Sequence, residues 1–432
     1  MTSLARYALD LYHYRILFGS RWVQQVVKLI KRPLYRVIPF CPTAGCCLMY
    51  LELSFTSASF LSLHHLNLTI PKHSLPSTTT NVMEANLAKL AEYQISRFFE
   101  ENAPATQREC DLEAIRITGT SVHTTSLQGG ESYTVLNSDE TRVVQFRAGY
   151  AALDMGFLGH IEQVYGRFTP HHEPIGKLGQ LHVYTMLNVG GVSMYLARDA
   201  LNRNNFSLRK YTVQDFARYV DPSVPYALSI YLRRRNVQLT WLWPCRFFAS
   251  AWNNTPKQMP CPSRASLLDE YSSELSQLHV GLPERFRPTL ADLISMLPSL
   301  LEPNWPLVPN HTDLLENNIH VSMETGHITG ICDWKDTTIG PFGMSLGGLE
   351  TMLGTETMSW GWGYHPNQQE LRDLFWETLY QEMGGVSEER KKLIDVSRLI
   401  GLFLANGFEW KDGVKVPASE GSDGLRYLES VL

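Results

Sequence analysis

The segment 311–336, HTDLLENNIHVSMETGHITGICDWKD, constrains the fold of this chain more than any other. Two short apolar runs, IHV and ITGIC, lie on either side of the pair Thr325-Gly326. Glycine accepts positive φ, so this pair favours a hairpin turn. Folding the hairpin about the pair sets residue 318 opposite residue 333. The pattern therefore predicts that Asn318 and Asp333 lie side by side at the open end of the hairpin.

The residues just before the hairpin add a second pattern. His311, Asp313 and Asn318 have the spacing H-x-D-x-x-x-x-N, which phosphoryl-transfer enzymes of the kinase type use. On one tight loop, Asp313 can accept a hydrogen bond from an attacking hydroxyl while Asn318 offers an amide oxygen to a metal ion. Oxygen ligands at one hairpin end suit Mg²⁺. Because the loop, the hairpin and the terminal aspartate agree, we interpret the set as functional, although His311 alone would be a structural histidine.

The segments HTDLLENNI and ITGICDWKDTTIGPFG resemble the catalytic and metal-binding segment of the aminoglycoside phosphotransferase/choline kinase-like family, especially its divergent fungal members. The resemblance implies an α+β, two-lobed protein-kinase-like fold, with a small antiparallel β-rich N-lobe and a larger, mainly helical C-lobe. It also implies that Asp313 is the catalytic base, that His311 supports it, and that Asn318 and Asp333 are Mg²⁺ ligands. Trp334 follows Asp333 in place of the Phe-Gly of protein kinases, which favours the small-molecule branch.

The resemblance extends to a nucleotide-binding N-lobe. The segment SLQGGESY resembles a shortened phosphate loop, in which Gly129 and Gly130 would let backbone N–H groups approach phosphates; a plain hairpin turn is the alternative. In VVQFR, Gln145 carries no charge, so Arg147 on the same face is the candidate phosphate-binding cation. The remaining nucleotide-binding candidates are Ser132 beside the loop, Glu162 as partner of the cation (or an exposed helix residue), and Tyr184 and Met186 at the hinge beside adenine.

Hydrophobic spacing predicts the elements around these motifs. We expect helices at 84–101, 154–165, 267–278, 289–301, 368–383 and 388–404, with Asn406-Gly407 as the stop signal of the last. Strands are expected at 133–136, 143–147 and 181–186, and the apolar pair Ile115 and Ile117 favours a further strand before them.

The length of 432 residues suggests at least two structural units. We expect an N-lobe at 83–187 and a C-lobe at 188–432. Residues 1–82 are an atypical extension, basic at first and then apolar at 42–63, which is either poorly ordered or a targeting or anchoring segment. The interpretation we favour is that the chain starts at Met83 and that the residues before it have no packed role.

A second unusual segment interrupts the C-lobe at 220–245. Three consecutive arginines, 233–235, lie close to Trp241 and Trp243, a combination that can indicate nucleic-acid binding. One short patch supplies few phosphate contacts, so an irregular insertion is the simpler interpretation. The flanks QDFAR and RFFASAWNNTP would join into one amphipathic helix without it, which suggests extra sequence such as a retained intron.

Composition narrows the function further. The chain is 44% hydrophobic and 19% charged, as in ordinary globular proteins, and its formal net charge of −5 gives no global reason to expect nucleic acid. Seven cysteines show no zinc-site spacing. We expect a cytoplasmic, ATP- and Mg²⁺-dependent enzyme acting on a small-molecule hydroxyl acceptor. Membrane attachment or organelle targeting through 1–82 is the alternative location, and a catalytically impaired pseudokinase, suggested by Gln145, is the alternative function.

Overall fold

The computed structural model describes residues 78–218, 247–256, 258–357 and 361–432. The extension predicted at 1–82 lies outside the described residues up to residue 77, and the insertion predicted at 220–245 lies outside them entirely. Within the described part of the chain, no helix is both long enough and apolar enough to cross a membrane. The apolar stretch 42–63 lies outside the described residues.

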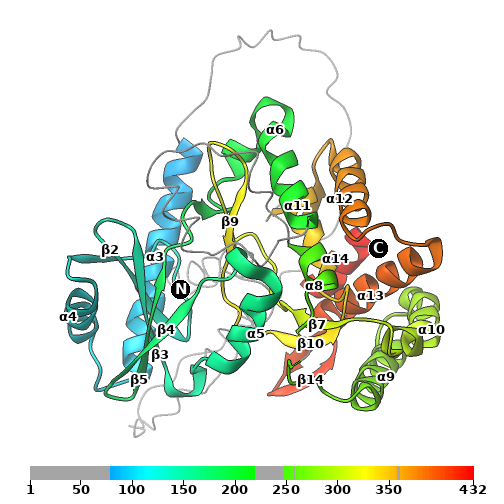
Figure 1. Ribbon diagram of the computed structural model, residues 1–432, viewed down its shortest axis with the longest axis horizontal. Helices are drawn as coiled ribbons and strands as arrows, with labels where there is room; N and C mark the ends of the chain where they lie inside the picture. Colours follow the sequence, from blue (N-terminus) through cyan, green and yellow to red (C-terminus); the bar gives the residue numbers. More distant parts are fainter. Residues whose placement is uncertain (1–77, 219–246, 257, 358–360) are drawn as a thin grey trace, which may run out of the picture.

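The first lobe is built on a five-stranded antiparallel sheet with the order β1-β2-β3-β5-β4. Its strands are β1 (Val122–Thr124), β2 (Ser132–Asn137), β3 (Arg142–Arg147), β4 (His172–Leu178) and β5 (Leu181–Leu187). Helices α3 (Thr78–Glu101) and α4 (Gln107–Thr118) pack against the sheet, and α5 (Met155–Tyr165) leads away from it toward the second lobe (Figure 1). Phe98, Cys110 and Phe146 are buried in the core that the two helices and the sheet share.

One predicted element is wrong. Ile115 and Ile117, expected in a strand, belong to helix α4. A capping box starts this helix: the Thr106 side chain accepts from the Glu109 N–H while the Glu109 carboxylate accepts from the Thr106 N–H. Gly119, at φ 75°, ends the helix and donates its N–H to the Ile115 carbonyl. Local capping therefore outweighs the apolar pair, whose spacing of two occurs in both kinds of element.

The second lobe is mainly helical, and the helices predicted at 154–165, 267–278, 289–301, 368–383 and 388–404 are confirmed within a few residues. It contains α6 (Arg198–Ala217), α8 (Phe248–Asn253), α9 (Arg264–Gly281), α10 (Arg287–Met296), α11 (Glu350–Leu353), α12 (Gln368–Glu382), α13 (Glu388–Asn406) and α14 (Asp423–Val431). Two short hairpins complete it, β11 (Gly354–Thr357) with β12 (Gly361–Tyr364) and β13 (Phe408–Lys411) with β14 (Val414–Pro417). Gly407 follows the last residue of α13, as predicted.

Two further ladders position the motif-bearing loops. Strand β7 (Leu307–Asn310) pairs with β10 (Thr338–Pro341), and β8 (Ile319–Val321) pairs with β9 (Ile328–Ile331) and β6 (Val192–Ser193). The loop 311–318 connects β7 to β8, and the loop 332–337 connects β9 to β10. Asn310 lies opposite Thr338, and Ile319 lies opposite Ile331. Both loops are thus bounded by the same two paired ends and must run side by side.

Helix α6 holds the hairpin turn. The fully buried Asp215 carboxylate accepts from the Ile328 N–H at 3.0 Å, and its oxygen lies 2.9 Å from His327 Nδ1. Thr212 donates its hydroxyl to the Gly326 carbonyl at 2.6 Å. Gly326 has φ 73°, as the turn prediction requires, and a Cβ there would come within 2.2 Å of the Leu208 carbonyl oxygen. The turn and the helix are therefore fixed against each other.

A buried ion network links four elements of the second lobe, α11, β12, α12 and α13. Glu350, with no exposed surface, accepts two hydrogen bonds from Arg372 at 2.7 and 2.8 Å. It also accepts from the Tyr364 hydroxyl at 2.9 Å and from Arg398 at 3.5 Å. A buried carboxylate costs stability unless it is paired, so these partners must act together.

Replacing Glu350 by alanine is expected to lower the free energy of unfolding by roughly 3–5 kcal/mol, because the partly buried Arg372 loses its carboxylate partner and Arg398 keeps only Asp395. Chemical denaturation measures the change. Glu388→Ala is the matched control, since Glu388 pairs with Lys391 on the surface and its side chain is 83% exposed. A Glu350→Ala variant as stable as Glu388→Ala would contradict the assignment.

Two buried histidines make stability depend on pH. Burial lowers the pKa of His172 and of His365 from the ordinary 6.5 to about 4. The unfolded chain takes up these protons at higher pH than the folded chain, so their stabilising effect is complete above pH 6.5. We expect it to be lost as pH falls from 6.5 toward 4, by up to about 1.4 kcal/mol per pH unit for each histidine. Denaturation at a series of pH values should show a shallower slope for His365→Asn and an unchanged slope for the exposed His123→Asn.

Candidate active site

His311 joins the two loops through both of its ring nitrogens. Nε2 lies 2.8 Å from the Cys332 carbonyl oxygen, to which it donates, and Nδ1 accepts from the Asp313 N–H at 3.1 Å. This pattern requires the neutral ring protonated on Nε2. Burial is the largest influence on the pKa of His311 and lowers it, which favours that neutral form. The ring of the buried Trp334 packs edge-on against it at 4.8 Å.

Asp313 and Asn318 are in direct contact. The Asn318 Nδ2 group donates to the Asp313 carbonyl at 2.8 Å and to Asp313 Oδ2 at 3.0 Å. Because the amide nitrogen is used in this way, Asn318 Oδ1 points elsewhere, where it accepts from Asn317 at 3.2 Å and keeps a lone pair. The predicted pair is thus brought together, with a carboxylate oriented by an amide.

The predicted hairpin register is wrong by one residue. Residue 318 was expected opposite residue 333, but the Cys332 N–H donates to the Asn318 carbonyl at 2.8 Å. At the turn, Ser322 pairs with His327, so the hairpin turns one residue earlier in the sequence than expected. Thr329 is an extra, unpaired residue in β9, and beyond it the pairing differs from the predicted register by one residue only.

Asp333 consequently follows the residue opposite Asn318 and lies just past the ladder. It is exposed and has φ 62°, in the left-handed region that few residues other than glycine adopt. Strained backbone of this kind is frequent at functional sites. Asn318 and Asp333 still occupy the same end of the hairpin, as predicted.

Sequence reasoning missed the contact that holds the middle of the loop. Glu316, 8% exposed, accepts from Arg198 Nε at 2.8 Å, and its backbone carbonyl accepts from the Tyr195 N–H at 3.2 Å. Arg198 also lies over the Tyr195 ring, 4.5 Å from its centre. The partners are 118 residues apart in sequence, so local spacing held no signal for the pair.

The predicted residues of the first lobe share one face of its sheet. Ser132 pairs with Arg147 across β2 and β3, Gln145 pairs with Tyr184, and Met186 is two residues further along β5. The opposite face carries Phe146 and the rest of the core shared with α3 and α4. The face bearing these candidates is therefore turned away from the helices.

The candidate cation of that face, Arg147, forms its hydrogen bonds within the first lobe. Arg147 is 5% exposed and donates from Nε to the Ala151 carbonyl at 2.7 Å and from Nη1 to Gln145 at 2.9 Å. Glu162 lies on α5, and its carboxylate is 2.9 Å from His171 Nδ1. Within the described residues, the structure does not bring Arg147 and Glu162 together as an ion pair. The Tyr184 hydroxyl accepts from the Leu153 N–H at 3.0 Å.

The glycine-containing loop lies between β1 and β2. Gln128, 4% exposed, holds it in place, since its side-chain amide donates to the Thr134 carbonyl at 2.7 Å and accepts from the Thr134 N–H at 3.0 Å. Gly129 and Gly130 follow directly, and a Cβ on Gly129 would lie 3.0 Å from Ser132 Oγ. The next residue, Glu131, forms an ion pair with Lys335 of the loop 332–337. Sequence reasoning missed this pair, which joins the two lobes.

The residues present fit a magnesium ion. Among the described residues, no group of three or more His, Cys, Asp or Glu side chains forms a metal site made of protein ligands alone. A cation here would depend on Asn318 Oδ1 and the Asp333 carboxylate, both hard oxygen donors, and on oxygens from a bound phosphate. Mg²⁺ is commonly held in this way, by one or two protein oxygens and by the phosphates of the substrate.

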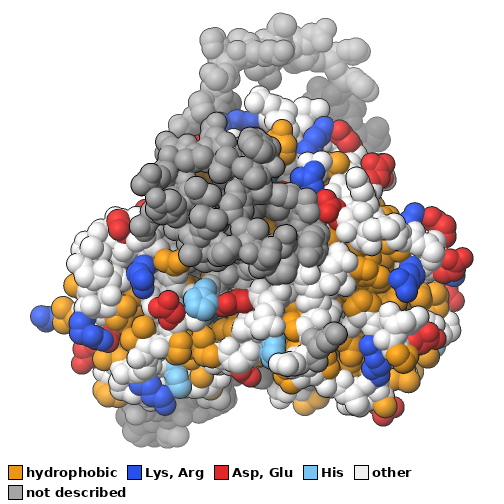
Figure 2. Space-filling view, in the orientation of Figure 1, with side chains coloured by type: hydrophobic (Ala, Val, Ile, Leu, Met, Phe, Trp, Pro, Cys, Tyr) orange, Lys and Arg blue, Asp and Glu red, His pale blue; other side chains and the backbone are white. Residues whose placement is uncertain are grey.

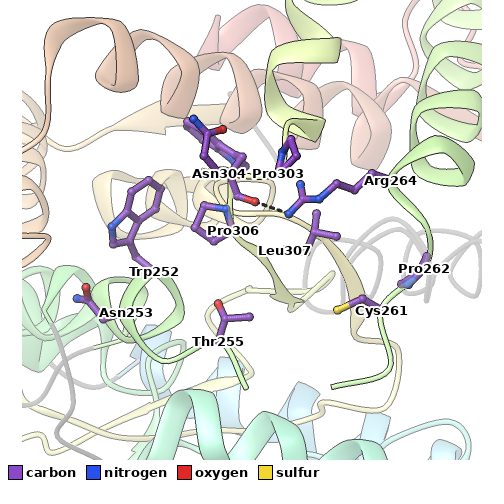
Figure 3. A pocket seen from close by; sticks show the side chains of 11 residues that line it. Trp252, Asn253, Thr255, Cys261, Pro262, Arg264, Pro303, Asn304, Pro306 and Leu307 are labelled. Carbon is purple, nitrogen blue, oxygen red and sulfur yellow. Dashed lines mark hydrogen bonds between the residues drawn. The ribbon is translucent and has the colours of Figure 1, made fainter. Parts of the chain in front are cut away.

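A cavity of about 500 Å³ lies elsewhere, beside the start of β7 (Figure 3). Trp252 and Trp305 line it, together with Arg264, which donates to the Trp305 carbonyl at 2.8 Å. Strand β7 separates it from His311 by four residues, roughly 13 Å at the rise of a strand. None of the predicted site residues contributes to its lining. On the described part of the face in Figure 2, basic and acidic side chains are interspersed rather than gathered into one basic area.

Comparison with known proteins supports the interpretation of the loops. Residues 253–370, which include both loops, match the model of the phosphotransferase enzyme family (APH). No curated protein matches the chain significantly. The resemblance predicted from the motifs is confirmed by this match, and the predicted two-lobed, protein-kinase-like α+β architecture is confirmed. The similarity to a phosphotransferase family is thus limited to this segment of the chain.

Several solved structures are also similar to this chain. An aminoglycoside phosphotransferase from Streptomyces rimosus is 12% identical, with 69% of this chain and 99% of that chain covered and a TM-score of 0.38. An ethanolamine kinase from Plasmodium vivax is 12% identical, with 75% of this chain and 86% of that chain covered and a TM-score of 0.39. A choline/ethanolamine kinase family protein from Mesorhizobium loti is 13% identical, with 69% of this chain and 82% of that chain covered and a TM-score of 0.40.

Breaking the Glu316–Arg198 pair is expected to loosen the loop 311–318. Glu316→Ala leaves the partly buried Arg198 without its carboxylate, so amide hydrogen exchange in the loop should become faster by about tenfold or more. Glu324→Ala, in the exposed part of the hairpin turn, is the control and should leave this exchange unchanged. Equal exchange rates in both variants would show that the pair does not hold the loop.

Proposed function

We propose that the protein transfers the γ-phosphate of ATP to a hydroxyl group of a small molecule. The observation that carries the proposal is the direct contact between Asp313 and Asn318 on a loop that His311 ties to the residue before Asp333. In this proposal, Asp313 is the proton acceptor, and Asn318 and Asp333 are two oxygen ligands at the same end of the hairpin. The match to the phosphotransferase enzyme family supports it independently.

The role of Asp313 follows from its contacts. Asn318 donates to one carboxylate oxygen, Oδ2, and so fixes the plane of the carboxylate. The other oxygen can then accept a hydrogen bond from the acceptor hydroxyl and orient it for attack. Positioning and charge neutralisation supply most of the rate gain in phosphoryl transfer, so a fixed carboxylate suits the task.

Asn318 and Asp333 would hold Mg²⁺, which when bound offsets the charge of the phosphates. The nucleotide would lie against the face of the first lobe that carries Ser132, Arg147, Tyr184 and Met186, beneath the loop with Gly129 and Gly130. Glu162, paired with His171 in this structure, would support that lobe through α5 and not through Arg147.

A second candidate function is a non-catalytic nucleotide-binding module. The observation in its favour is that Gln145 is neutral and that Arg147 donates to Gln145 and to the Ala151 carbonyl. We favour the active enzyme because the loop 311–318 carries all three residues of the motif, His311, Asp313 and Asn318. For either function we propose a cytoplasmic protein with lobes at 83–187 and 188–432, a small-molecule partner and no nucleic-acid partner.

Asp313→Ala is expected to fold and to bind ATP normally while ADP formation falls by roughly 10²–10⁴-fold, because the acceptor hydroxyl loses its oriented base. ADP release would be measured over a panel of hydroxyl compounds, and ATP binding by thermal shift with and without Mg²⁺. Asp292→Ala, an exposed carboxylate on α10, is the control and should keep wild-type turnover.

Three outcomes separate the two functions. Near-wild-type turnover in Asp313→Ala would contradict the assigned base. ATP binding without turnover of any compound, in the wild type, would favour the non-catalytic module. A wild-type protein whose thermal stability does not respond to ATP and Mg²⁺ would contradict both.

A further inference from the structure

The ion pair between Glu131 and Lys335 crosses from one lobe to the other. Glu131 directly follows Gly130 in the loop between β1 and β2, and Lys335 is two residues after Asp333. The Lys335 ammonium contacts the Glu131 carboxylate, and the side chains are 18% and 23% exposed. A lysine on the proposed metal loop thus reaches the proposed phosphate loop, across the space between them.

Lys335 differs in charge from every other residue of the loops that carry the proposed site. The three loops 125–131, 311–318 and 332–337 are fully described, and Lys335 is the only Lys or Arg in them. The strand cation, Arg147, already donates to the Ala151 carbonyl and to Gln145. A nucleotide triphosphate bound at these loops needs more positive charge than one Mg²⁺ supplies.

We propose that Lys335 is the phosphate-binding cation of this protein and that Glu131 holds it when no nucleotide is bound. On binding, Lys335 exchanges one anionic partner for another, and Glu131, which is partly exposed, turns to water. The lysine thereby supplies the charge that Gln145 lacks. This inference rests on the proposed function, since it concerns the nucleotide site.

The competing explanation is that the Glu131–Lys335 ion pair only holds the two lobes together and does not take part in nucleotide binding. If the pair only held the lobes together, removing either partner would have the same effect on nucleotide binding. If Lys335 binds phosphate, the two removals have opposite effects, because losing Glu131 frees the lysine and losing Lys335 removes the ligand contact. The sign of the change therefore decides.

The test is isothermal titration calorimetry of the full chain with ADP plus Mg²⁺ and, separately, with adenosine. We expect Lys335→Met to weaken ADP binding roughly ten- to hundredfold, the range for a lost charge-assisted hydrogen bond. Adenosine, which has no phosphate, should bind as in the wild type. Glu131→Gln should bind ADP several-fold more tightly, and Lys335→Arg, which keeps the charge, should recover most of the affinity.

The control is Lys415→Met, which removes another partly exposed lysine, on β14, from its ion pair with Glu274 on α9. It should bind ADP like the wild type. Equal losses in Lys335→Met and Glu131→Gln, or an equal loss for adenosine and ADP in Lys335→Met, would overturn the inference while leaving the proposed function intact. A wild type that binds neither ligand would overturn the proposed function and the inference together.

Discussion

The geometry of the candidate site depends on one buried imidazole. His311 uses one nitrogen as a donor to the Cys332 carbonyl and the other as an acceptor from the Asp313 N–H, so it connects the loop of the base to the loop of Asp333. A protonated ring could not accept from Asp313. Burial lowers the pKa of His311, which favours the neutral ring and hence both contacts. The residue predicted to be structural in isolation is thus what turns two separate loops into one site.

The surrounding fold gives those loops a rigid base. Two strand ladders fix their ends, and Asp215 of α6 accepts from the Ile328 N–H at the turn. Tyr165 of α5 donates its hydroxyl to the Pro309 carbonyl, while its ring lies 4.8 Å from that of Trp334. Reactive side chains on loops need such a base, because flexibility at the loop ends would move them out of range.

Sequence patterns within one segment predicted the features that depend only on neighbouring residues of that segment. The hairpin, the positive φ of Gly326 and the contact of Asp313 with Asn318 were all predictable from spacing. The register was not, since the extra residue Thr329 has no marker in the sequence. The expected strand at Ile115 is wrong for a different reason: the capping box of Thr106 and Glu109 starts a helix, and an apolar pair two residues apart carries no sign of it.

Pairs between distant segments could not be predicted in this way. Glu131 and Lys335 are 204 residues apart, and each looks like an ordinary surface charge when only the sequence around it is considered. The same limit applies to Arg147, whose candidacy followed from strand period but whose partners are set by the backbone at Ala151. Spacing therefore identifies which residue types can do chemistry, whereas the fold decides which charges remain available for it.

That distinction bears on how a site without a lysine at position 145 could handle phosphate. The three loops carry five carboxylates and one lysine: Glu131, Asp313, Glu316, Asp333 and Asp336 against Lys335. Glu316 is neutralised from outside the loops by Arg198, and Glu131 by Lys335 itself. The remaining acids favour a divalent cation, and one such cation offsets only part of the charge of a polyphosphate. Lys335 is therefore the only basic side chain of these three loops, and in our proposal its partner, Glu131 or a phosphate, sets the charge that an incoming nucleotide meets.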